Sequence, residues 1–428
     1  MNYQVPFGRG SLSFTPPAGM TLDVIRPPTP AALPDFPAAL AAALRHPLAA
    51  PRLRELARPD SRICLVFTDA TRACPDELLV PALLAELHAA GAPAANITLL
   101  CATGLHRAST LAEKTAKLGA DIVARYRIVD HDAMQDVVSL GQTDSGIPLT
   151  VNRLAAAADL LLATGVVEPH QYAGFSGGSK TVAVGTAGEA MIAWTHGPAM
   201  LDQPAVRLGN LAGNPFQAAV REAGRRAGLR FVLNVALTDH GQPWAVAAGA
   251  PDAVHDHLAG LVQRVSAVTA AAPYDVIIAG VGFPKDQNFY QASRAATYVA
   301  LTARPALAPD GVIVLPASCP EGMGQGAGEQ RFAALLRAGA DRPADLLAEL
   351  RRRGFPPGSQ RAYLLAQVLV QHPVVVTGAL CPEEIAAGHL RTAVSLEEAL
   401  AWAQAHLGRP PSAALIPHAL TTVLTLAS

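Results

Sequence analysis

The chain has 428 residues, of which 50% are hydrophobic and only 16% are charged, so it is long enough for two or three domains with sizeable cores. Its 33 basic and 34 acidic residues give a formal net charge of -1. This balance argues against a general binder of nucleic acids or anionic membranes, which would show a basic excess, and it favours a small-molecule partner.

Short apolar runs alternate with longer helical patterns in the first half of the chain. The run RICLVFTDATR (62–72) predicts a buried strand that leads into a loop, and ELLVPALLAELHAAG (77–91) predicts an amphipathic helix. The strand-then-loop form recurs in NITLLCATGLHR (96–107), RYRIVDHD (125–132) and ADLLLATGVVEPH (158–170). Such alternation is typical of an α/β fold with a largely parallel sheet.

A second set of strands is predicted in the C-terminal part. After a helix near residues 216–228, the segment 230–249 predicts two strands around an Asp-His-Gly turn. The weakly patterned stretch VSAVTAAAP predicts a domain junction near residue 270. Four apolar runs beyond it predict a second sheet: YDVIIAGVGFP, DGVIVLPAS, HPVVVTGAL and SAALIPHAL. We therefore expect two α/β domains, residues 1–270 and 271–428.

Cysteine usage and hydropathy indicate the compartment. The five cysteines are odd in number, far apart and without a C-x-x-C pair, which argues against a disulfide framework or a zinc-thiolate site. The N-terminal segment lacks the apolar run of a signal peptide, and no run of about 18 apolar residues predicts a membrane-spanning helix. We expect a soluble cytoplasmic protein that has neither a membrane nor a nucleic acid as its partner.

Polar residues follow several of the predicted strands. They are Asp69, Arg72, His106 and His170. Ligands of α/β proteins bind outside the carboxyl ends of the strands, where these loops lie. Any one of the four could instead hydrogen-bond to the backbone of its own loop. Together they predict a shared polar cleft.

The segment GFSGGSKT (Gly174–Thr181) is one residue short of a phosphate-binding loop, because Ser179 stands where that motif has its last glycine. A phosphate loop lies between a strand and a helix. Here seven residues separate the nearest predicted strand from the glycines, and TVAVGTAG after Lys180 is poor helix material. These flanks disfavour a nucleotide site. Lys180 is interpreted as a point charge for an anion, a covalent attachment site or a solvated surface residue.

Histidine spacing gives no ordinary metal cage. His196 follows Lys180 by sixteen residues, and the histidines near these motifs form no H-x₃-H pair of the kind that binds zinc. The residues alone support a polar cleft with Arg72, His106, His170, Lys180 and His196.

Taken together, these motifs resemble the nickel-dependent lactate racemase family. The resembling segments are, in family order, DATRACP (69–75), ATGLHR (102–107), EPHQYAGFSGGSK (168–180), THG (195–197), GNP (213–215) and GFPKDQNFYQASRA (282–295). They span most of the chain. Each motif is weak by itself, and the ordered set is highly specific.

The resemblance implies a cofactor. In this family the lysine at the position of Lys180 is covalently joined to a nickel-pincer nucleotide, a nickel pyridinium-3,5-bisthiocarboxylic acid mononucleotide, which cofactor-biosynthesis proteins supply. His196 matches the histidine that completes the nickel coordination. The glycines would let the backbone approach the cofactor closely. Beside the cofactor we expect Asp69, Ser176, Gly177 and Gly178.

The resemblance also implies a reaction, the racemisation or epimerisation of a 2-hydroxy acid by reversible hydride transfer. His106 and His170 match the two acid/base histidines, which suits an imidazole whose ordinary pKa is about 6.5. Residues implied at the substrate are Arg72, Tyr290, Gln291 and Arg294. Arg294 replaces the lysine of lactate racemases proper, which points to a bulkier hydroxy acid, a dicarboxylate or a sugar acid. An active-site cleft between the two domains is expected, with the C-terminal domain closing over the substrate.

Two other functions stay open at this stage. One is a nucleotide-dependent phosphoryl-transfer enzyme that uses the near-phosphate loop Gly174–Thr181. The other is a non-catalytic protein that binds a small acid. The sequence leaves the oligomeric state, the identity of the 2-hydroxy acid and the direction of the reaction undetermined.

Overall fold

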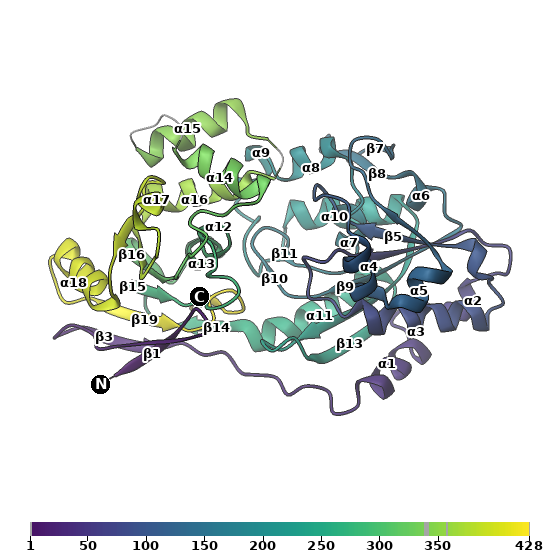
Figure 1. Cartoon of the computed structure of the whole chain (residues 1–428), viewed down its shortest axis with the longest axis horizontal. Coiled ribbons are helices and arrows are strands. Elements are labelled where there is room, and N and C mark those ends of the chain that lie inside the picture. The colour runs from purple at the N-terminus through teal and green to yellow at the C-terminus, as the bar shows by residue number, and fades with distance from the viewer. Residues whose placement is uncertain (1, 338–341, 357, 428) are drawn as a thin grey trace. The chain divides into compact units, whose positions relative to one another are not determined.

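The computed structural model describes residues 2–337, 342–356 and 358–427, and Figure 1 shows the path of the chain. The chain divides into two compact units. Unit 1 consists of Met1–Pro28, Gly197–Asn210 and Ser266–Ser428, and unit 2 consists of Thr29–His196 and Leu211–Val265. The N-terminal segment therefore belongs with the C-terminal part of the chain, an assignment that local sequence patterns do not indicate.

Unit 2 is built on a six-stranded sheet in the order β13-β12-β9-β4-β5-β6. Neighbouring strands are parallel, except for the antiparallel pair β12 and β13. The strands are β4 (Ile63–Thr68), β5 (Ile97–Ala102), β6 (Arg127–Asp130), β9 (Leu160–Val166), β12 (Leu229–Leu237) and β13 (Pro243–Gly249). The predicted α/β fold with a largely parallel sheet is confirmed, as is the predicted strand pair within residues 230–249.

Helices cover both faces of this sheet. Every residue of β4 is buried, and its side chains alternate between two cores. Leu65 and Phe67 belong to the core that contains α3, whereas Cys64 and Val66 belong to the core that contains α7 and α11. The helices of unit 2 are α1 (Phe36–Arg45), α2 (Leu53–Leu56), α3 (Asp76–Ala89), α4 (Leu111–Leu118), α5 (Ala120–Arg125), α6 (Arg153–Ala156), α7 (Lys180–Ala183), α8 (Glu189–Thr195), α10 (Pro215–Arg226) and most of α11 (Pro251–Ser266).

Two hairpins complete unit 2. The strands β7 (Val137–Gln142) and β8 (Pro148–Asn152) form one antiparallel pair, and β10 (Pro169–His170) with β11 (Gly174–Phe175) forms the other. A one-turn 3₁₀ helix, η1 (Ala94–Asn96), precedes β5. The β10–β11 hairpin carries His170 and leads directly into the glycines before Lys180.

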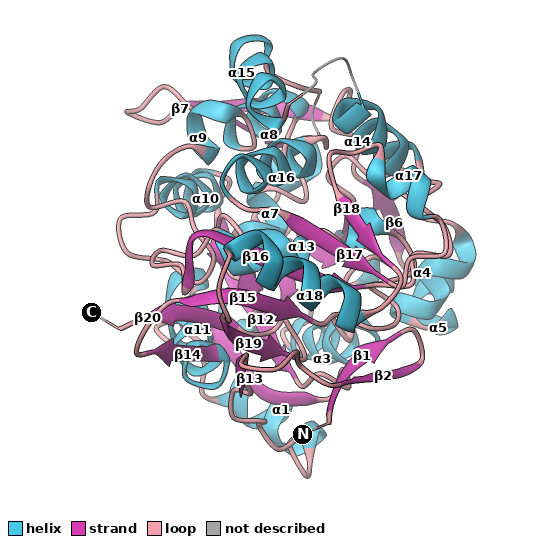
Figure 2. Ribbon diagram, turned by 90° about the vertical axis from the view of Figure 1, so that its left-hand side faces the viewer, coloured by secondary structure: helices cyan, strands magenta, loops and turns pink. Residues whose placement is uncertain are grey.

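Unit 1 has its own six-stranded sheet, in which all neighbouring strands are parallel and the order is β18-β17-β16-β15-β19-β3. The strands are β3 (Thr21–Val24), β15 (Tyr274–Ala279), β16 (Leu307–Pro316), β17 (Val374–Thr377), β18 (Arg391–Ala393) and β19 (Ser412–Ile416). Figure 2 shows helix α18 (Leu396–Leu407) in front of this sheet, and the buried residues of the helix belong to the same core as those of the strands. Helix α13 (Arg294–Ala300) also packs against β15 and β16.

The remaining elements of unit 1 are short strand pairs and helices. The strand pairs are β1 (Tyr3–Phe7) with β2 (Gly10–Phe14) and β14 (Ala267–Ala270) with β20 (Val423–Leu426). The helices are α9 (Pro198–Leu201), α12 (Phe289–Ala292), α14 (Ala327–Arg337), α15 (Pro343–Arg353), α16 (Gln360–Gln371) and α17 (Pro382–Ala386). The weakly patterned stretch near residue 270 thus contains a strand, β14, whose partner lies at the far end of the chain. Within the described ranges, no helix combines the length and apolar character needed to cross a membrane.

Candidate functional site

The carboxyl ends of β9, β4 and β5 are neighbours in the sheet of unit 2. Asp69 directly follows β4, His106 follows β5 by four residues, and His170 follows β9 by four residues. Parallel strands place their carboxyl ends at one edge of a sheet, which is where α/β proteins bind ligands. The loop of His106 is also tied to the segment after Lys180, because the amide of Gly104 donates to the carbonyl of Gly185 at 2.9 Å.

Asp69 and His106 form a hydrogen-bonded pair. Oδ2 of the buried Asp69 lies 2.7 Å from Nδ1 of His106, and its Oδ1 accepts a hydrogen bond from Thr71 at 2.8 Å. Burial alone would raise the pKa of Asp69, but the hydrogen bonds from His106 and Thr71 and the charges of His106 and Arg72 lower it. A carboxylate at this position fixes Nδ1 as the protonated nitrogen and leaves Nε2 of His106 as a proton acceptor. The His106 side chain is 52% exposed, so Nε2 can meet a substrate.

His170 is held in the opposite tautomer. The amide of Ala173 donates to Nδ1 of His170 at 3.2 Å, so the neutral imidazole carries its proton on Nε2. Tyr172, in the turn of the β10–β11 hairpin, packs edge-on against His170 with ring centroids 4.5 Å apart. Tyr172 also packs edge-on against His196 at 5.0 Å. One tyrosine ring therefore joins the two predicted histidines.

The residues before Lys180 form a tightly packed loop. A Cβ on Gly177 would lie 2.5 Å from Cγ2 of Val167, and one on Gly178 would lie 2.8 Å from Cβ of His255. Both glycines also have positive φ angles, +88° and +56°. Packing within the protein is thus sufficient reason for glycine here, beside the close cofactor approach expected from the resemblance. Ser176 closes the same hairpin, because its Oγ donates to the carbonyl of Val166 at 2.7 Å.

Lys180 is the first residue of α7 and is partly buried. The pKa of its amine falls from the ordinary 10.5 to about 7, mainly because of burial and also because of the positive charge of Arg72, while the negative charge of Glu168 acts in the opposite direction. A substantial fraction of these amines is therefore uncharged at neutral pH. Because the uncharged amine is the nucleophilic form, the structure favours a covalent attachment site over a solvated surface residue.

His196 is buried at the end of α8 and is neutral. Its Nδ1 lies 3.1 Å from the carbonyl oxygen of Ile192 and 3.0 Å from Oγ1 of Thr195. Burial lowers the pKa of His196 to about 3, with a further contribution from the charge of Lys180. Donation from Nδ1 to the Ile192 carbonyl leaves a lone pair on Nε2, which is the form of histidine that binds metals.

The surroundings of Lys180 differ from a phosphate loop. The β10–β11 hairpin lies between β9 and the glycines, and the helix that follows has only four residues. A phosphate loop leads directly from a strand into a helix whose N-terminus faces the phosphates. The geometry therefore disfavours the phosphoryl-transfer alternative. Among the described residues, no group of three or more histidine, cysteine or acidic side chains could hold a metal ion.

The other predicted substrate residues lie in unit 1. Tyr290 and Gln291 are on α12, and Arg294 begins α13, where its Nη2 donates to the hydroxyl of Tyr298 at 2.9 Å. Arg361 of α16 was not predicted. Its Nη1 lies 2.8 Å from the Tyr290 carbonyl and 3.3 Å from Oε1 of Gln291, and its guanidinium stacks 3.9 Å above the Tyr290 ring. Arg361 therefore fixes the two residues that are predicted to face the substrate.

Asn234 is a second residue that sequence reasoning missed. It is fully buried on β12, and its Oδ1 accepts a hydrogen bond from the amide of Gly178 at 2.7 Å. This contact holds the loop that presents Lys180. A single asparagine inside the otherwise apolar run 231–237 was the available signal, because a buried amide in a strand is costly unless it has a partner.

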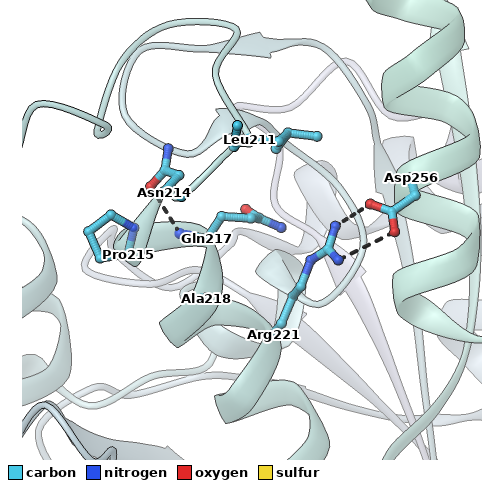
Figure 3. Close-up of a pocket in the computed structure, with 9 residues that line it drawn as sticks. Leu211, Asn214, Pro215, Gln217, Ala218, Arg221 and Asp256 are labelled. Carbon is cyan, nitrogen blue, oxygen red and sulfur yellow. Dashed lines mark hydrogen bonds and ion pairs between the residues drawn. The ribbon is translucent and has the colours of Figure 1, made fainter.

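A pocket of about 530 Å³ lies at the start of α10, and Figure 3 shows the residues that line it. Arg221 points across to Asp256 of α11, with which it forms an ion pair. Asn214 belongs to the GNP motif, and its Nδ2 donates to the carbonyl of Tyr172 at 2.9 Å. None of the predicted site residues lines the pocket. The motif therefore supports the tyrosine between the two histidines, and the pocket itself is separate from the candidate site.

Comparison with known proteins gives matches over nearly the whole chain. Residues 7–209 match the family model described as the lactate racemase N-terminal domain, and residues 269–424 match that of the lactate racemase C-terminal domain. The chain is 31% identical over 432 residues to a lactate racemase of Thermoanaerobacterium thermosaccharolyticum, with 99% of each chain covered. It is 34% identical over 387 residues to a lactate racemase of Lactiplantibacillus plantarum, with 89% of each covered.

Solved structures agree in fold. The apoprotein structure of the lactate racemase from Thermoanaerobacterium thermosaccharolyticum superposes with a TM-score of 0.89 at 30% identity, covering 99% of this chain and 100% of that one. A crystal structure of a Thermotoga maritima protein gives a TM-score of 0.63 at 17% identity, covering 88% and 96%. The second likeness concerns the fold alone.

Proposed function

Because this chain belongs to the lactate racemase family, we propose that it interconverts the stereoisomers of a 2-hydroxy acid with the help of a nickel-pincer nucleotide tethered to Lys180. Family membership makes the protein a racemase, and therefore an isomerase. The observation that carries the finer proposal is the grouping of the motif side chains in unit 2. The Tyr172 ring contacts both His170 and His196. The charge of the partly buried Lys180 also acts on His196, and the pKa values of the two groups are lowered to about 7 and about 3.

The residues of unit 2 fit the demands of such a cofactor. An uncharged amine on Lys180 is the form that makes a covalent bond to an electrophilic carbon. His196 would offer Nε2 as a nickel ligand, since its Nδ1 is directed to the Ile192 carbonyl. One protein ligand is sufficient when the cofactor brings the other donors to the metal. Cofactor-biosynthesis proteins are then partners that load the chain.

The two histidines divide the handling of protons. When bound, the cofactor would supply the acceptor that takes a hydride from the substrate α-carbon and later returns it. Nε2 of His106, oriented by Asp69, accepts the proton of the substrate hydroxyl. In the tautomer that the Ala173 amide selects, Nε2 of His170 donates a hydrogen bond to the substrate oxygen. The proton returns to that oxygen from an imidazolium ring, which becomes neutral again. For the opposite enantiomer, His170 is the base, and its ring must then hold the tautomer with an unprotonated Nε2.

Arginine side chains are proposed to bind the substrate carboxylate. Arg72 lies exposed in the loop after β4, and its planar guanidinium can hold a carboxylate through two hydrogen bonds. Arg294 is proposed as a second contact, together with Tyr290 and Gln291. A guanidinium in place of a lysine reaches further and is planar, so we propose a bulkier hydroxy acid, a dicarboxylate or a sugar acid as the substrate.

Racemisation in deuterium oxide tests the proposal. The protein is produced together with cofactor-biosynthesis proteins and is given enantiopure 2-hydroxyisocaproate, malate or glycerate, and the products are followed by chiral chromatography and mass spectrometry. Hydride transfer predicts inversion without deuterium at the α-carbon, because that hydrogen returns from the cofactor. Deuterium at the α-carbon would contradict hydride transfer, although the protein would still be a racemase. If none of the three acids is converted, the result would count against all three proposed substrate types. Lys180→Ala is expected to abolish turnover, and Lys114→Ala serves as the control.

A further inference from the structure

A buried ion pair lies directly beneath the loop that carries Asp69 and Arg72. Asp76, the first residue of α3, has no exposed surface, and Lys117 of α4 is 9% exposed. Their atoms Oδ2 and Nζ lie 3.0 Å apart. Thr68, at the end of β4, donates to Oδ2 of Asp76 at 2.5 Å, and Thr164 of β9 donates to Oδ1 at 2.5 Å. The Asp76 carboxylate therefore links α3 to two neighbouring strands of the sheet.

The ammonium group of Lys117 holds the loop itself. Its Nζ lies 3.0 Å from the carbonyl oxygen of Arg72, 2.7 Å from that of Cys74 and 3.0 Å from Oγ1 of Thr68. With Oδ2 of Asp76, these oxygens make four acceptors around an ammonium group that has only three N–H donors, so all of its donors are used. With the carbonyls of residues 72 and 74 turned inward, the side chain of Arg72 is left at the surface, where it is exposed.

We propose that Lys117 and Asp76 are positioning residues that set the loop 69–75, so that Asp69 meets His106 and Arg72 faces the substrate. The effect on catalysis rests on the proposed function, whereas the effect on the loop does not. The amide of Arg72 donates to the carbonyl of Asp69 at 3.1 Å, so a shift of the Arg72 carbonyl moves the same turn that presents Asp69.

Stability alone gives no reason for a charged pair at this place. Removing two charges from water is costly, and apolar residues of similar volume often replace a buried pair without loss. Apolar side chains cannot, however, hydrogen-bond the carbonyls of residues 72 and 74. Lys117 therefore differs from a leucine or methionine in that it donates hydrogen bonds to the loop backbone.

Three variants separate positioning from stability. Lys117→Met removes the ammonium group and leaves Asp76 unpaired. The double variant Lys117→Met with Asp76→Leu removes both charges, and it keeps the test decisive if the single variant fails to fold. Lys114→Met is the matched control, because Lys114 lies on the same helix and pairs with Asp130 at 2.5 Å without touching the loop.

Three measurements are made on each folded variant. Hydrogen exchange, followed by mass spectrometry on peptides that cover residues 69–75, reports the hold on the loop without any assumption about function. Steady-state kinetics of the cofactor-loaded protein report kcat and KM. Unfolding midpoints show whether the double variant regains stability.

In both Lys117→Met and the double variant, we expect the amide hydrogens of residues 69–75 to exchange about tenfold faster. We also expect kcat/KM to fall roughly 10- to 100-fold, because small misplacements of catalytic groups slow a reaction strongly. The Lys114→Met control should leave both quantities within twofold. A double variant with normal stability, normal loop exchange and normal kcat/KM would overturn the proposal. If the unmodified protein racemises nothing, the proposed function fails, and the exchange rates still decide whether Lys117 positions the loop.

Discussion

Replacing Lys180 with methionine is expected to stabilise the cofactor-free protein, and the gain should shrink as the pH rises. Burial lowers the pKa of the Lys180 amine from its ordinary 10.5 to about 7. Between these values the unfolded chain binds a proton that the folded chain does not, so the free energy of unfolding rises with pH across this window. Below pH 7 the full cost of folding a charged amine is present. Methionine has a similar length and no charge, so it removes that cost.

The size of the effect follows from the pKa difference. A fall from 10.5 to about 7 corresponds to ~5 kcal/mol at pH values below 7, because each pKa unit is worth about 1.4 kcal/mol. Part of the side chain reaches solvent, and water near the amine lowers the cost. We therefore expect Lys180→Met to gain about 2 kcal/mol or more at pH 6 and less than about 1 kcal/mol at pH 10.

Urea unfolding at pH 6 and pH 10 measures both values. The Lys114→Met variant is the control, since Lys114 has an ion-pair partner in Asp130 and its loss should cost stability. Equal stability of Lys180→Met and the unmodified protein at both pH values would refute the reasoning. The amine would then be an ordinary solvated one, and the argument for a nucleophilic lysine would be lost.

Three further substitutions test other contacts. Asp69→Asn removes a charge-assisted hydrogen bond to His106 that is worth about 1.5–3 kcal/mol, so kcat should fall roughly 10- to 150-fold in steady-state assays with little change in KM. A kcat within twofold of that of the unmodified protein would contradict a role for this hydrogen bond. Gly178→Ala places a Cβ 2.8 Å from Cβ of His255 on a backbone with positive φ, so urea unfolding should show that the free energy of unfolding falls by about 1–3 kcal/mol. An unchanged free energy of unfolding would argue against a tightly packed loop. Arg361→Leu should raise KM more than it lowers kcat, because Arg361 holds Tyr290 and Gln291, the proposed substrate contacts. A lowered kcat at constant KM would contradict this supporting role.

Much of the sheet of unit 2 could be predicted from the sequence, because its strands are continuous apolar runs. The run 63–68 is buried on both faces, and the polar residues that follow it lie at the carboxyl edge of a parallel sheet. This rule is local and needs no knowledge of distant contacts. It is the reason that Asp69, His106 and His170 could be singled out before the fold was known.

The division into units depends on strand pairings that local sequence patterns do not predict. Strand β3, near the N-terminus, pairs with β19, and β14 pairs with β20 at the end of the chain. Each pairing joins segments that lie far apart in sequence, and the residue pattern of neither strand predicts which strand it pairs with. The weakly patterned stretch near residue 270 is therefore read as a junction from its composition, although it contains β14.

The supporting contacts of the site were likewise beyond local patterns. Asn234 supports Gly178 from a neighbouring strand, and Lys117 supports Arg72 from a helix that packs against the loop. Arg361 reaches the residues of α12 from another helix. A lysine or arginine on a helix usually indicates a solvated face, and only the three-dimensional packing shows which one turns inward.

An intact mass and peptide map around Lys180, with nickel analysis, test the central claim most directly. The chain has only four lysines, so Lys114, Lys117 and Lys285 act as internal controls in the same digest. The protein is produced in cells that make the pincer cofactor, beside a racemase of the family that is shown to be loaded. The account predicts a covalent adduct on Lys180 and about one nickel per chain. An unmodified Lys180 without nickel, while the parallel racemase is loaded, would contradict it.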